Sequence, residues 1–199
     1  MAQEHIHPIF DKLLQTETKE TLLKQRGKVI WLIGLSGSGK STIAEYLEAR
    51  LYDEGFLTQV LDGDNIRSGL NNNLSFSDED RLENIRRIAE VAKLFANCGV
   101  VTLASFITPT EAIREMAKAI IGEDKYLEVY VATTLEECEK RDVKGLYDKA
   151  RKGIIKNFTG IDSVFETPKN SEIILSTEGQ TIDETVKTLY QFIIKKISY

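Results

Sequence analysis

The sequence predicts an α/β fold in which a mainly parallel five-stranded sheet lies between layers of helices. Short apolar segments alternate along the chain with segments whose apolar residues recur at helical spacing, a pattern typical of parallel sheets that are covered on both faces. The chain has 199 residues, of which 42% are hydrophobic and 29% are charged. These are the values of an ordinary globular protein, and the length fits one main domain.

The first 27 residues are predicted to form a helical extension, which is followed by the main domain over residues 28–199. Within the extension, residues 9–25 combine charged residues with several apolar ones. Their spacing predicts either one amphipathic helix or two short turns. We expect the apolar face to pack against another surface, because exposed apolar area is unfavourable in water. The residues of this face are Ile9, Leu13, Leu14, Leu22 and Leu23.

Five strands are predicted in the main domain. The first, Val29–Ile33, is rich in β-branched and aromatic residues, as expected of a central strand that is buried on both faces. A glycine-rich turn follows it directly. The other strands are predicted at Thr58–Leu61, Val100–Phe106, Leu127–Ala132 and Ile173–Leu175.

The segments between the strands have the apolar spacing of helices. Residues 41–54 place four large apolar side chains on one face, and Gly55 ends this helix. Residues 77–97 begin with a Ser-x-x-Asp capping pattern and continue with apolar residues at helical spacing. Further helices are predicted at 110–121, 134–150 and 181–196.

Composition excludes several classes of protein. The net charge of −5 argues against a non-specific nucleic-acid binder. No apolar run approaches the roughly 20 residues of a membrane-spanning helix, and no apolar segment follows Met1, so we expect a cytoplasmic protein without a membrane partner. Cys98 and Cys138 form no CxxC pattern, which fits a reducing compartment. Both are expected to be small buried residues.

A phosphate-binding loop follows the first strand and makes the predicted fold a three-layer P-loop NTPase fold. The loop matches the Walker A pattern G-x-x-x-x-G-K-[ST] in full, between a strand and a helix. Glycines let its backbone N–H groups approach a polyphosphate closely. Lys40 is expected to be catalytic and to reach the β and γ phosphates of ATP, and Ser41 to bind Mg²⁺ through its hydroxyl. The loop consists of Gly34, Leu35, Ser36, Gly37, Ser38, Gly39, Lys40 and Ser41.

Two carboxylates lie at the end of the second strand, in the segment Asp62-Gly63-Asp64-Asn65-Ile66-Arg67. Ligands of open α/β sheets bind along the edge that is formed by the carboxyl ends of the strands. A carboxylate there can orient Mg²⁺ through water or accept the proton of an attacking hydroxyl. Asp64 is predicted to be this general base. The alternative is a polar turn without a catalytic role, since Asp, Asn and Gly are common turn residues.

Further candidates lie at the start of the long helix. A polar loop before the helix carries one aromatic residue, Phe76, which could cover a nucleotide base. Arg81 and Asn84 lie three residues apart on one helix face and can reach the same ligand. Arg86 and Arg87 either contribute to that site or pair with neighbouring acids on the surface.

The motifs resemble those of the adenylyl-sulfate kinase family from about residue 28 to 170. The resemblance implies that the 3′-hydroxyl of adenylyl sulfate attacks the γ-phosphate of MgATP, giving 3′-phosphoadenylyl sulfate and ADP in sulfate assimilation. It also implies a mobile lid, a homodimer and a functional link to a separate ATP sulfurylase. Besides the phosphate loop and the segment from Asp62 to Arg67, the matching segments are Gly69-Leu70-Asn71, Phe76-Ser77, Asp80-Arg81-x-Glu83-Asn84-Ile85-Arg86-Arg87, Phe106-Ile107-Thr108-Pro109, Cys138-Glu139-x-Arg141-Asp142-x-Lys144-Gly145-Leu146-Tyr147 and Lys156-x-Phe158-Thr159-Gly160-Ile161-Asp162.

The resemblance implies roles for single residues. Asp64 would lie near the 3′-hydroxyl, and Phe76 and Phe158 would enclose the adenine of the acceptor. Thr42 joins the ATP-binding residues, and Arg141 would pack against the adenine of ATP. Thr108 is counted as catalytic as well as substrate-binding, and Lys144 belongs to the lid. The full set of substrate-binding residues is Asp64, Arg67, Asn71, Phe76, Arg81, Asn84, Ile107, Thr108, Lys144 and Phe158.

Several positions depart from the common pattern of the family. Thr108 replaces a serine, Thr110-Glu111 replaces Tyr-Arg, Asn73 replaces an aspartate and Ser75 replaces a glycine. Arg114, one helical turn further on, could replace the missing cationic contact. Two alternatives therefore stay open. One is a related P-loop kinase with another nucleotide-linked acceptor, such as a cytidine diphosphoramidate, and the other is an ATP-binding module without a small-molecule acceptor.

Overall fold

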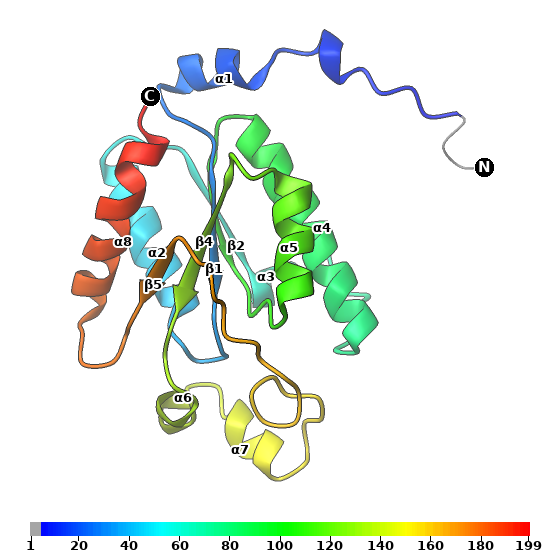
Figure 1. The fold of residues 1–199 in the computed structure, drawn as a ribbon, viewed down its shortest axis with the longest axis vertical. Coiled ribbons are helices and arrows are strands. Elements are labelled where there is room, and N and C mark those ends of the chain that lie inside the picture. The colour runs from blue at the N-terminus through cyan, green and yellow to red at the C-terminus, as the bar shows by residue number, and fades with distance from the viewer. Residues whose placement is uncertain (1–4) are drawn as a thin grey trace.

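The computed structural model describes residues 5–199 and confirms the predicted α/β fold (Figure 1). Its sheet has the strand order β2-β3-β1-β4-β5, and each neighbouring pair of strands is parallel. Over the described residues, no helix is both long enough and apolar enough to cross a membrane. The strands are β1 (Val29–Ile33), β2 (Thr58–Asp62), β3 (Val101–Ser105), β4 (Tyr126–Val131) and β5 (Ile173–Leu175).

Helices cover both faces of the sheet and give the predicted three layers. α2 (Lys40–Asp53) and α8 (Ile182–Ile197) pack on one face, and α4 (Asp78–Asn97) and α5 (Glu111–Ile121) pack on the other. The shorter helices are η1 (Phe10–Lys12), α1 (Thr16–Leu23), α3 (Gly63–Ser68), α6 (Leu135–Arg141) and α7 (Leu146–Arg151).

The central strand β1 divides the core into two halves. All five of its residues are fully buried, and successive side chains of a strand point to opposite faces. Ile30 and Leu32 therefore pack in the cluster that contains α2 and α8, whereas Trp31 and Ile33 pack in the cluster with α4 and α5. Truncating such a residue, as in Leu32→Ala, typically costs about 2–5 kcal/mol of stability.

The topology itself opens a crevice between β1 and β3. The helix that follows β1, α2, crosses one face of the sheet, and the helix that follows β3, α5, crosses the other. Where neighbouring strands send their connections to opposite faces, the carboxyl ends of the strands border a ligand-binding crevice. The phosphate loop leaves β1 at this point, and residues 106–110 leave β3 beside it.

The prediction of one helix over residues 134–150 is wrong. The chain forms α6 and α7 instead, with a break at Asp142, which ends α6 with φ of 23°, and at Gly145, whose φ of 63° favours glycine. The Asp142 carboxylate accepts hydrogen bonds from the backbone N–H groups of Tyr147 and Asp148, both at 3.0 Å. Capping by Asp142 therefore begins a new helix at this point, although the apolar spacing would allow one continuous helix.

A short helix that was not predicted, α3, follows β2 directly. Its N-cap is Asp62, whose Oδ1 accepts a hydrogen bond of 3.1 Å from the Asp64 N–H. The turn-forming residues of this segment thus begin a helix, because an aspartate before a helix satisfies a free backbone donor. As a result, Asp64 lies in the first turn of α3, at the carboxyl edge of the sheet.

The cysteine prediction is correct for Cys138 and wrong for Cys98. Cys138 is fully buried on α6. Cys98 is exposed because it is the C-cap of α4, beyond the last turn that packs on the sheet.

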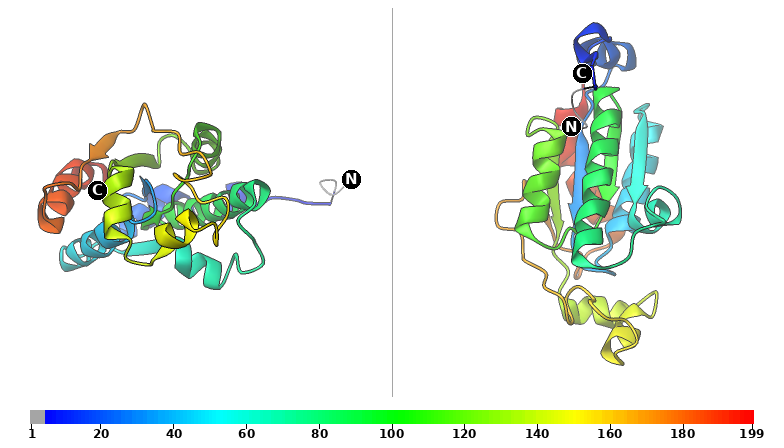
Figure 2. Two further views of the ribbon diagram at one scale, coloured as in Figure 1. Left: turned by 90° about the horizontal axis from the view of Figure 1, so that it is seen from below. Right: turned by 90° about the vertical axis from the view of Figure 1, so that its right-hand side faces the viewer.

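The N-terminal extension forms the two short elements η1 and α1 rather than one helix. It lies at the amino ends of the strands, whereas α6 and α7 lie beyond the carboxyl ends (Figure 2). Gln25 joins the extension to the body, because its buried amide donates to Leu57 O at 2.9 Å and Gly99 O at 2.7 Å. Most of the expected apolar face does not pack on this chain, since Ile9, Leu13, Leu14 and Leu22 are exposed. Leu23 is half-buried and packs beside Gly99. The lid is the segment formed by α6 and α7, which contains Lys144 between the two helices. The boundary at residue 27 and the mobility of the lid stay predictions.

Candidate active site

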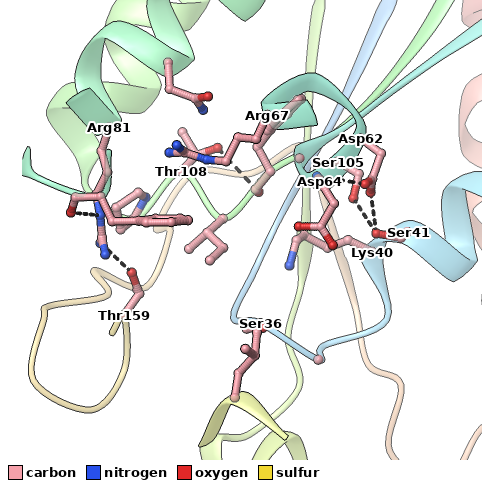
Figure 3. A pocket seen from close by; sticks show the side chains of 18 of the residues that line it. Ser36, Lys40, Ser41, Asp62, Asp64, Arg67, Arg81, Ser105, Thr108 and Thr159 are labelled. Carbon is pink, nitrogen blue, oxygen red and sulfur yellow. Dashed lines mark hydrogen bonds between the residues drawn. The ribbon is translucent and has the colours of Figure 1, made fainter. Parts of the chain in front are cut away.

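A cavity of about 260 Å³ lies at the carboxyl ends of the strands. Its wall combines the phosphate loop, the start of α3, the start of α4, the segment after β3 and the lid (Figure 3). Thirteen of the residues predicted from the sequence line it together: Ser36, Gly37, Lys40, Ser41, Asp64, Arg67, Phe76, Arg81, Asn84, Ile107, Thr108, Lys144 and Phe158. The predicted donor and acceptor residues therefore share one cavity.

The phosphate loop has the backbone that its glycines allow. Gly37 and Gly39 have φ of 74° and 104°, a region that other residues rarely adopt. Lys40 is 7% exposed, and its Nζ donates to Gly34 O at 2.9 Å and Leu35 O at 2.7 Å. Burial lowers the pKa of Lys40 to about 8. The ammonium thus depends on carbonyl groups of its own loop and gains little from solvent.

Ser41 lies in a small polar cluster at the base of the cavity. Its hydroxyl donates to Asp62 Oδ2 at 2.6 Å, and its Oγ lies 3.2 Å from Ser105 Oγ. These three side chains come from the start of α2 and the ends of β2 and β3. Asp62 belonged to the predicted carboxylate pair. Ser105 was not predicted as a site residue. Its position near the end of a predicted strand could have indicated it, because ligands bind at that edge of the sheet.

The predicted general base contacts the lid. Asp64 forms an ion pair with Lys144, which precedes α7, and both side chains are exposed. Lys144 therefore reaches across the mouth of the cavity from the lid to α3. The pair joins two residues whose roles were assigned from separate motifs.

Arg67 and Arg81 organise the two loops that carry the predicted adenine-binding rings. The guanidinium carbon of Arg67 lies 4.3 Å from the centroid of the Phe76 ring, a cation–π contact. Arg81 donates from Nε to Phe76 O at 3.1 Å and from its guanidinium to Thr159 Oγ1 at 2.9 Å. Arg81 thus connects the loop of Phe76 with the loop of Phe158, and Thr159 is a second lining residue that sequence reasoning missed.

Asn71 lies beneath the cavity lining and holds one of the lining residues in place. It is fully buried and does not line the cavity. Its Nδ2 donates to Asn84 Oδ1 at 2.9 Å, which fixes the orientation of an amide that does line the cavity. A role of Asn71 in direct substrate contact stays a prediction.

The segment after β3 is held in a strained conformation. Thr108 has φ of 47°, rare for a β-branched residue. Its Oγ1 accepts a hydrogen bond of 2.9 Å from Nε1 of the fully buried Trp31, which sequence reasoning did not single out. Arg114 donates to Thr108 O at 3.3 Å and to Glu166 O at 3.0 Å. Arg114 does not line the cavity, and the suggestion that it replaces a cationic substrate contact stays a prediction.

Three other arginines lie outside the cavity lining. Arg141 pairs with Glu137 at 3.0 Å and donates to Thr177 Oγ1 at 3.1 Å, so its predicted contact with the adenine of ATP stays untested. Arg86 and Arg87 both pair with Glu83, at 2.6 and 2.7 Å. Hydrogen bonds from Arg86 and then Arg87 lower the pKa of Glu83 to about 2. Of the two alternatives from the sequence, the structure therefore shows the second: these arginines pair with a neighbouring acid.

Comparison with known proteins identifies the family. The sequence model of the family described as "Adenylylsulphate kinase" matches residues 26–176. The chain belongs to the adenylyl-sulfate kinase family. An adenylyl-sulfate kinase from Bacteroides thetaiotaomicron is 58% identical over 195 residues, which cover 98% of this chain and 97% of the relative. One from Clostridium kluyveri is 52% identical over 185 residues, 93% of this chain and 92% of the relative.

Solved members of the family have the same fold. The Mycobacterium tuberculosis APS kinase CysC in complex with AMPPNP and APS superposes with a TM-score of 0.82 and 44% identity, covering 85% of this chain and 98% of that chain. A hexameric APS kinase from Thiobacillus denitrificans superposes with a TM-score of 0.65 and 29% identity, covering 87% of this chain and 30% of that chain. The family resemblance inferred from the motifs is therefore correct.

Proposed function

We propose that this adenylyl-sulfate kinase family member transfers the γ-phosphate of ATP to the 3′-hydroxyl of adenylyl sulfate, giving 3′-phosphoadenylyl sulfate and ADP. One observation carries the proposal: the phosphate loop with Lys40 and the acceptor-side group of Asp64, Arg67, Phe76 and Arg81 line a single cavity. In-line phosphoryl transfer needs the donor and the attacking hydroxyl to be held against each other. A P-loop module without a small-molecule acceptor would not need the second group of residues.

The donor half of the site would bind MgATP. Backbone N–H groups of the phosphate loop and the N-terminus of α2 favour a polyphosphate, and Lys40 would leave its loop carbonyls to neutralise the β and γ phosphates. The polar cluster suits Mg²⁺, because hydroxyl and carboxylate oxygens are the ligands that this ion prefers. Ser41 would bind the ion directly and Asp62 would hold its water ligands. The ion supplies charge neutralisation at the transferred group.

The acceptor half would hold adenylyl sulfate. Phe76 and Phe158 would enclose its adenine, and stacking on aromatic rings is worth about 1–3 kcal/mol per base. Arg67, Arg81 and Asn84 would bind the sulfate-phosphate end. Further contacts to the acceptor would come from Ile107 and Thr108.

Asp64 would accept the proton of the 3′-hydroxyl as it attacks. The ion pair with Lys144 places this carboxylate beside the lid residue that is expected to approach the phosphates. Transfer of the phosphoryl group would require Lys144 to turn from Asp64 to the phosphates, where its charge stabilises the transition state. The lid would therefore exchange one anionic partner for another during the reaction.

A panel of acceptors tests the proposed function. We expect ADP release with adenylyl sulfate and little with adenosine 5′-monophosphate, because the sulfate-binding arginines then lack their ligand. Turnover with a cytidine diphosphoramidate but not with adenylyl sulfate would favour the related kinase. ADP release that does not depend on any acceptor would favour an ATP-binding module.

The assembly and setting of the enzyme are also proposals. The hexameric structure from Thiobacillus denitrificans shows that one family member forms oligomers, and the exposed apolar residues of the N-terminal extension supply a surface for association. We propose a homodimer in the cytoplasm. A separate ATP sulfurylase would supply adenylyl sulfate for sulfate assimilation.

A further inference from the structure

A third cluster of buried side chains, separate from the two main cores, lies beneath the lid. Its buried members are Leu35, Cys138 and Tyr147, and Phe158 packs against them. They come from the phosphate loop, α6, α7 and the segment that follows α7. This cluster therefore joins the donor loop, the lid and one wall of the acceptor site in a single apolar contact.

Tyr147 is the member that contacts both halves of the active site directly. Its side chain is 3% exposed, and its hydroxyl donates to Ser36 O in the phosphate loop at 2.8 Å. Its ring lies edge-on against the ring of Phe158, with centroids 4.9 Å apart and an angle of 75° between the planes. Burial raises the pKa of the Tyr147 hydroxyl, so this group stays protonated and available as a donor.

The hydrogen bond to Ser36 has a consequence for the phosphate loop. A peptide group is planar and trans, so its C=O and N–H point in opposite directions. The carbonyl of Ser36 points at Tyr147, and the N–H of Gly37 in the same peptide therefore points away from the lid. Gly37 lines the cavity, and a phosphate held by the loop needs backbone N–H donors from the loop.

The position of Tyr147 is itself fixed. Its backbone N–H and that of Asp148 are held by the carboxylate of Asp142, which caps the start of α7. The ring also lies over Gly37, where an added Cβ would come within 3.9 Å of Tyr147 Cε2. The ring of Tyr147 is thus in contact with the loop at Ser36 and with the ring of Phe158.

We propose that Tyr147 is a positioning residue that couples nucleotide binding at the phosphate loop to acceptor binding at Phe158. A bound triphosphate fixes the Ser36 peptide, the fixed peptide holds Tyr147, and Tyr147 holds the Phe158 ring in the orientation that stacks on the acceptor base. By linkage, the acceptor strengthens nucleotide binding by the same factor. The identity of the acceptor rests on the proposed function, but the coupling does not depend on the phosphoryl transfer step.

A binding cycle tests the coupling. The dissociation constant of adenylyl sulfate is measured by calorimetry with and without the non-hydrolysable nucleotide AMPPNP. We expect the nucleotide to strengthen acceptor binding by about 5-fold or more in the unmodified enzyme. In Tyr147→Phe this factor should fall below about twofold, because the ring remains but the bond to Ser36 is lost. Nucleotide binding alone should weaken by about fivefold, the usual effect of one hydrogen bond, and acceptor binding alone should not change.

Matched variants separate coupling from general damage. Tyr190→Phe also removes a tyrosine hydroxyl, which bonds to Glu54 at the end of α2, outside the cavity lining, and should keep the full factor. Phe158→Leu breaks the ring contact from the other side, and the double variant Tyr147→Phe/Phe158→Leu should show no further loss of coupling. The control and the double variant thus report whether the effect runs through one chain of contacts.

Two results would overturn the inference. One is the same coupling factor in Tyr147→Phe as in the unmodified enzyme, and the other is no coupling in the unmodified enzyme at all. If the acceptor panel identifies a different acceptor, the same cycle is run with that compound. A failure of the proposed function appears in the turnover assay, whereas a failure of the coupling appears only in the binding cycle.

Discussion

Lys40 is buried in a site that will not readily hold a positive charge. Its hydrogen-bond acceptors are carbonyl oxygens of its own loop, and burial lowers its pKa to about 8. Burial of an ammonium opposes folding unless partners repay the lost hydration. We infer that this position favours transition-state stabilisation over the stability of the free enzyme, a common property of functional sites.

Lys40→Met should therefore separate activity from stability. We expect turnover to fall by about 10²- to 10³-fold, the usual loss for one donor to a developing charge, while the melting temperature at pH 7 does not fall. The folded enzyme binds fewer protons than the unfolded chain between the folded pKa of about 8 and the ordinary 10.5, so Lys40 makes stability rise with pH across this window. That part of the rise should be absent in Lys40→Met. A lower melting temperature at pH 7 would show that the charge is stabilising.

Asp64 offers a second prediction for a single residue. Asp64→Asn keeps the shape of the side chain but cannot accept a proton, so turnover should fall by about 10²- to 10⁴-fold. The dissociation constant of ATP should change little, because the phosphate loop is not altered. Near-normal turnover in this variant would exclude Asp64 as the base, and an equal loss of ATP binding would indicate a structural effect instead.

At the scale of elements, hydrogen bonds of Arg114 connect the two segments that border the acceptor site, and we call this connection the brace. Arg114 on α5 reaches Thr108 O and Glu166 O, and the Glu166 N–H donates to Pro109 O at 2.8 Å. The Glu166 carboxylate accepts the N–H of Glu111 at the start of α5 at 2.7 Å. The segment after β3 is thereby tied to the segment that follows Phe158. The strained backbone of Thr108 persists because several contacts define it at once.

Arg114→Met should weaken the acceptor site without affecting the donor site. The change leaves two carbonyl groups without their buried donor, at a cost of about 1–3 kcal/mol, so the melting temperature should fall. KM for adenylyl sulfate should rise about tenfold, while KM for ATP changes less than twofold. The control is Lys118→Met on the same helix, where the ion pair with Glu123 is long at 3.9 Å. Equal rises in both KM values would contradict the brace.

Some elements could be read from the sequence and others could not. β1 and β5 have the predicted bounds, because short apolar segments between turn residues leave few alternatives. The break between α6 and α7 escaped detection since it depends on one side chain, Asp142, capping the next helix. The bond from Trp31 to Thr108 escaped for a related reason. This hydrogen bond joins residues far apart in the chain. The spacing of apolar residues indicates which face of an element is buried but not which distant side chain it contacts.

At the scale of the whole molecule, the site was largely predictable because its motifs all end at one edge of the sheet. A parallel α/β fold brings the carboxyl ends of its strands together, so the segments after β1, β2 and β3 had to meet. Contacts between the lid and the body were not predictable in the same way. The pair of Lys144 with Asp64 and that of Tyr147 with Ser36 depend on how α6 and α7 fold back over the cavity.

The N-terminal extension leads to a prediction about assembly. Phe10 and Leu14 are 74% and 70% exposed, so they add little to the stability of one chain. If this surface joins two copies, Phe10→Glu/Leu14→Glu places charges in an apolar interface and should convert the dimer to a monomer in sedimentation experiments. The melting temperature measured at low protein concentration should change little. Tyr52→Glu, at a residue on α2 that is 75% exposed, should leave the dimer intact. A dimer that survives the double substitution would place the interface elsewhere on the molecule.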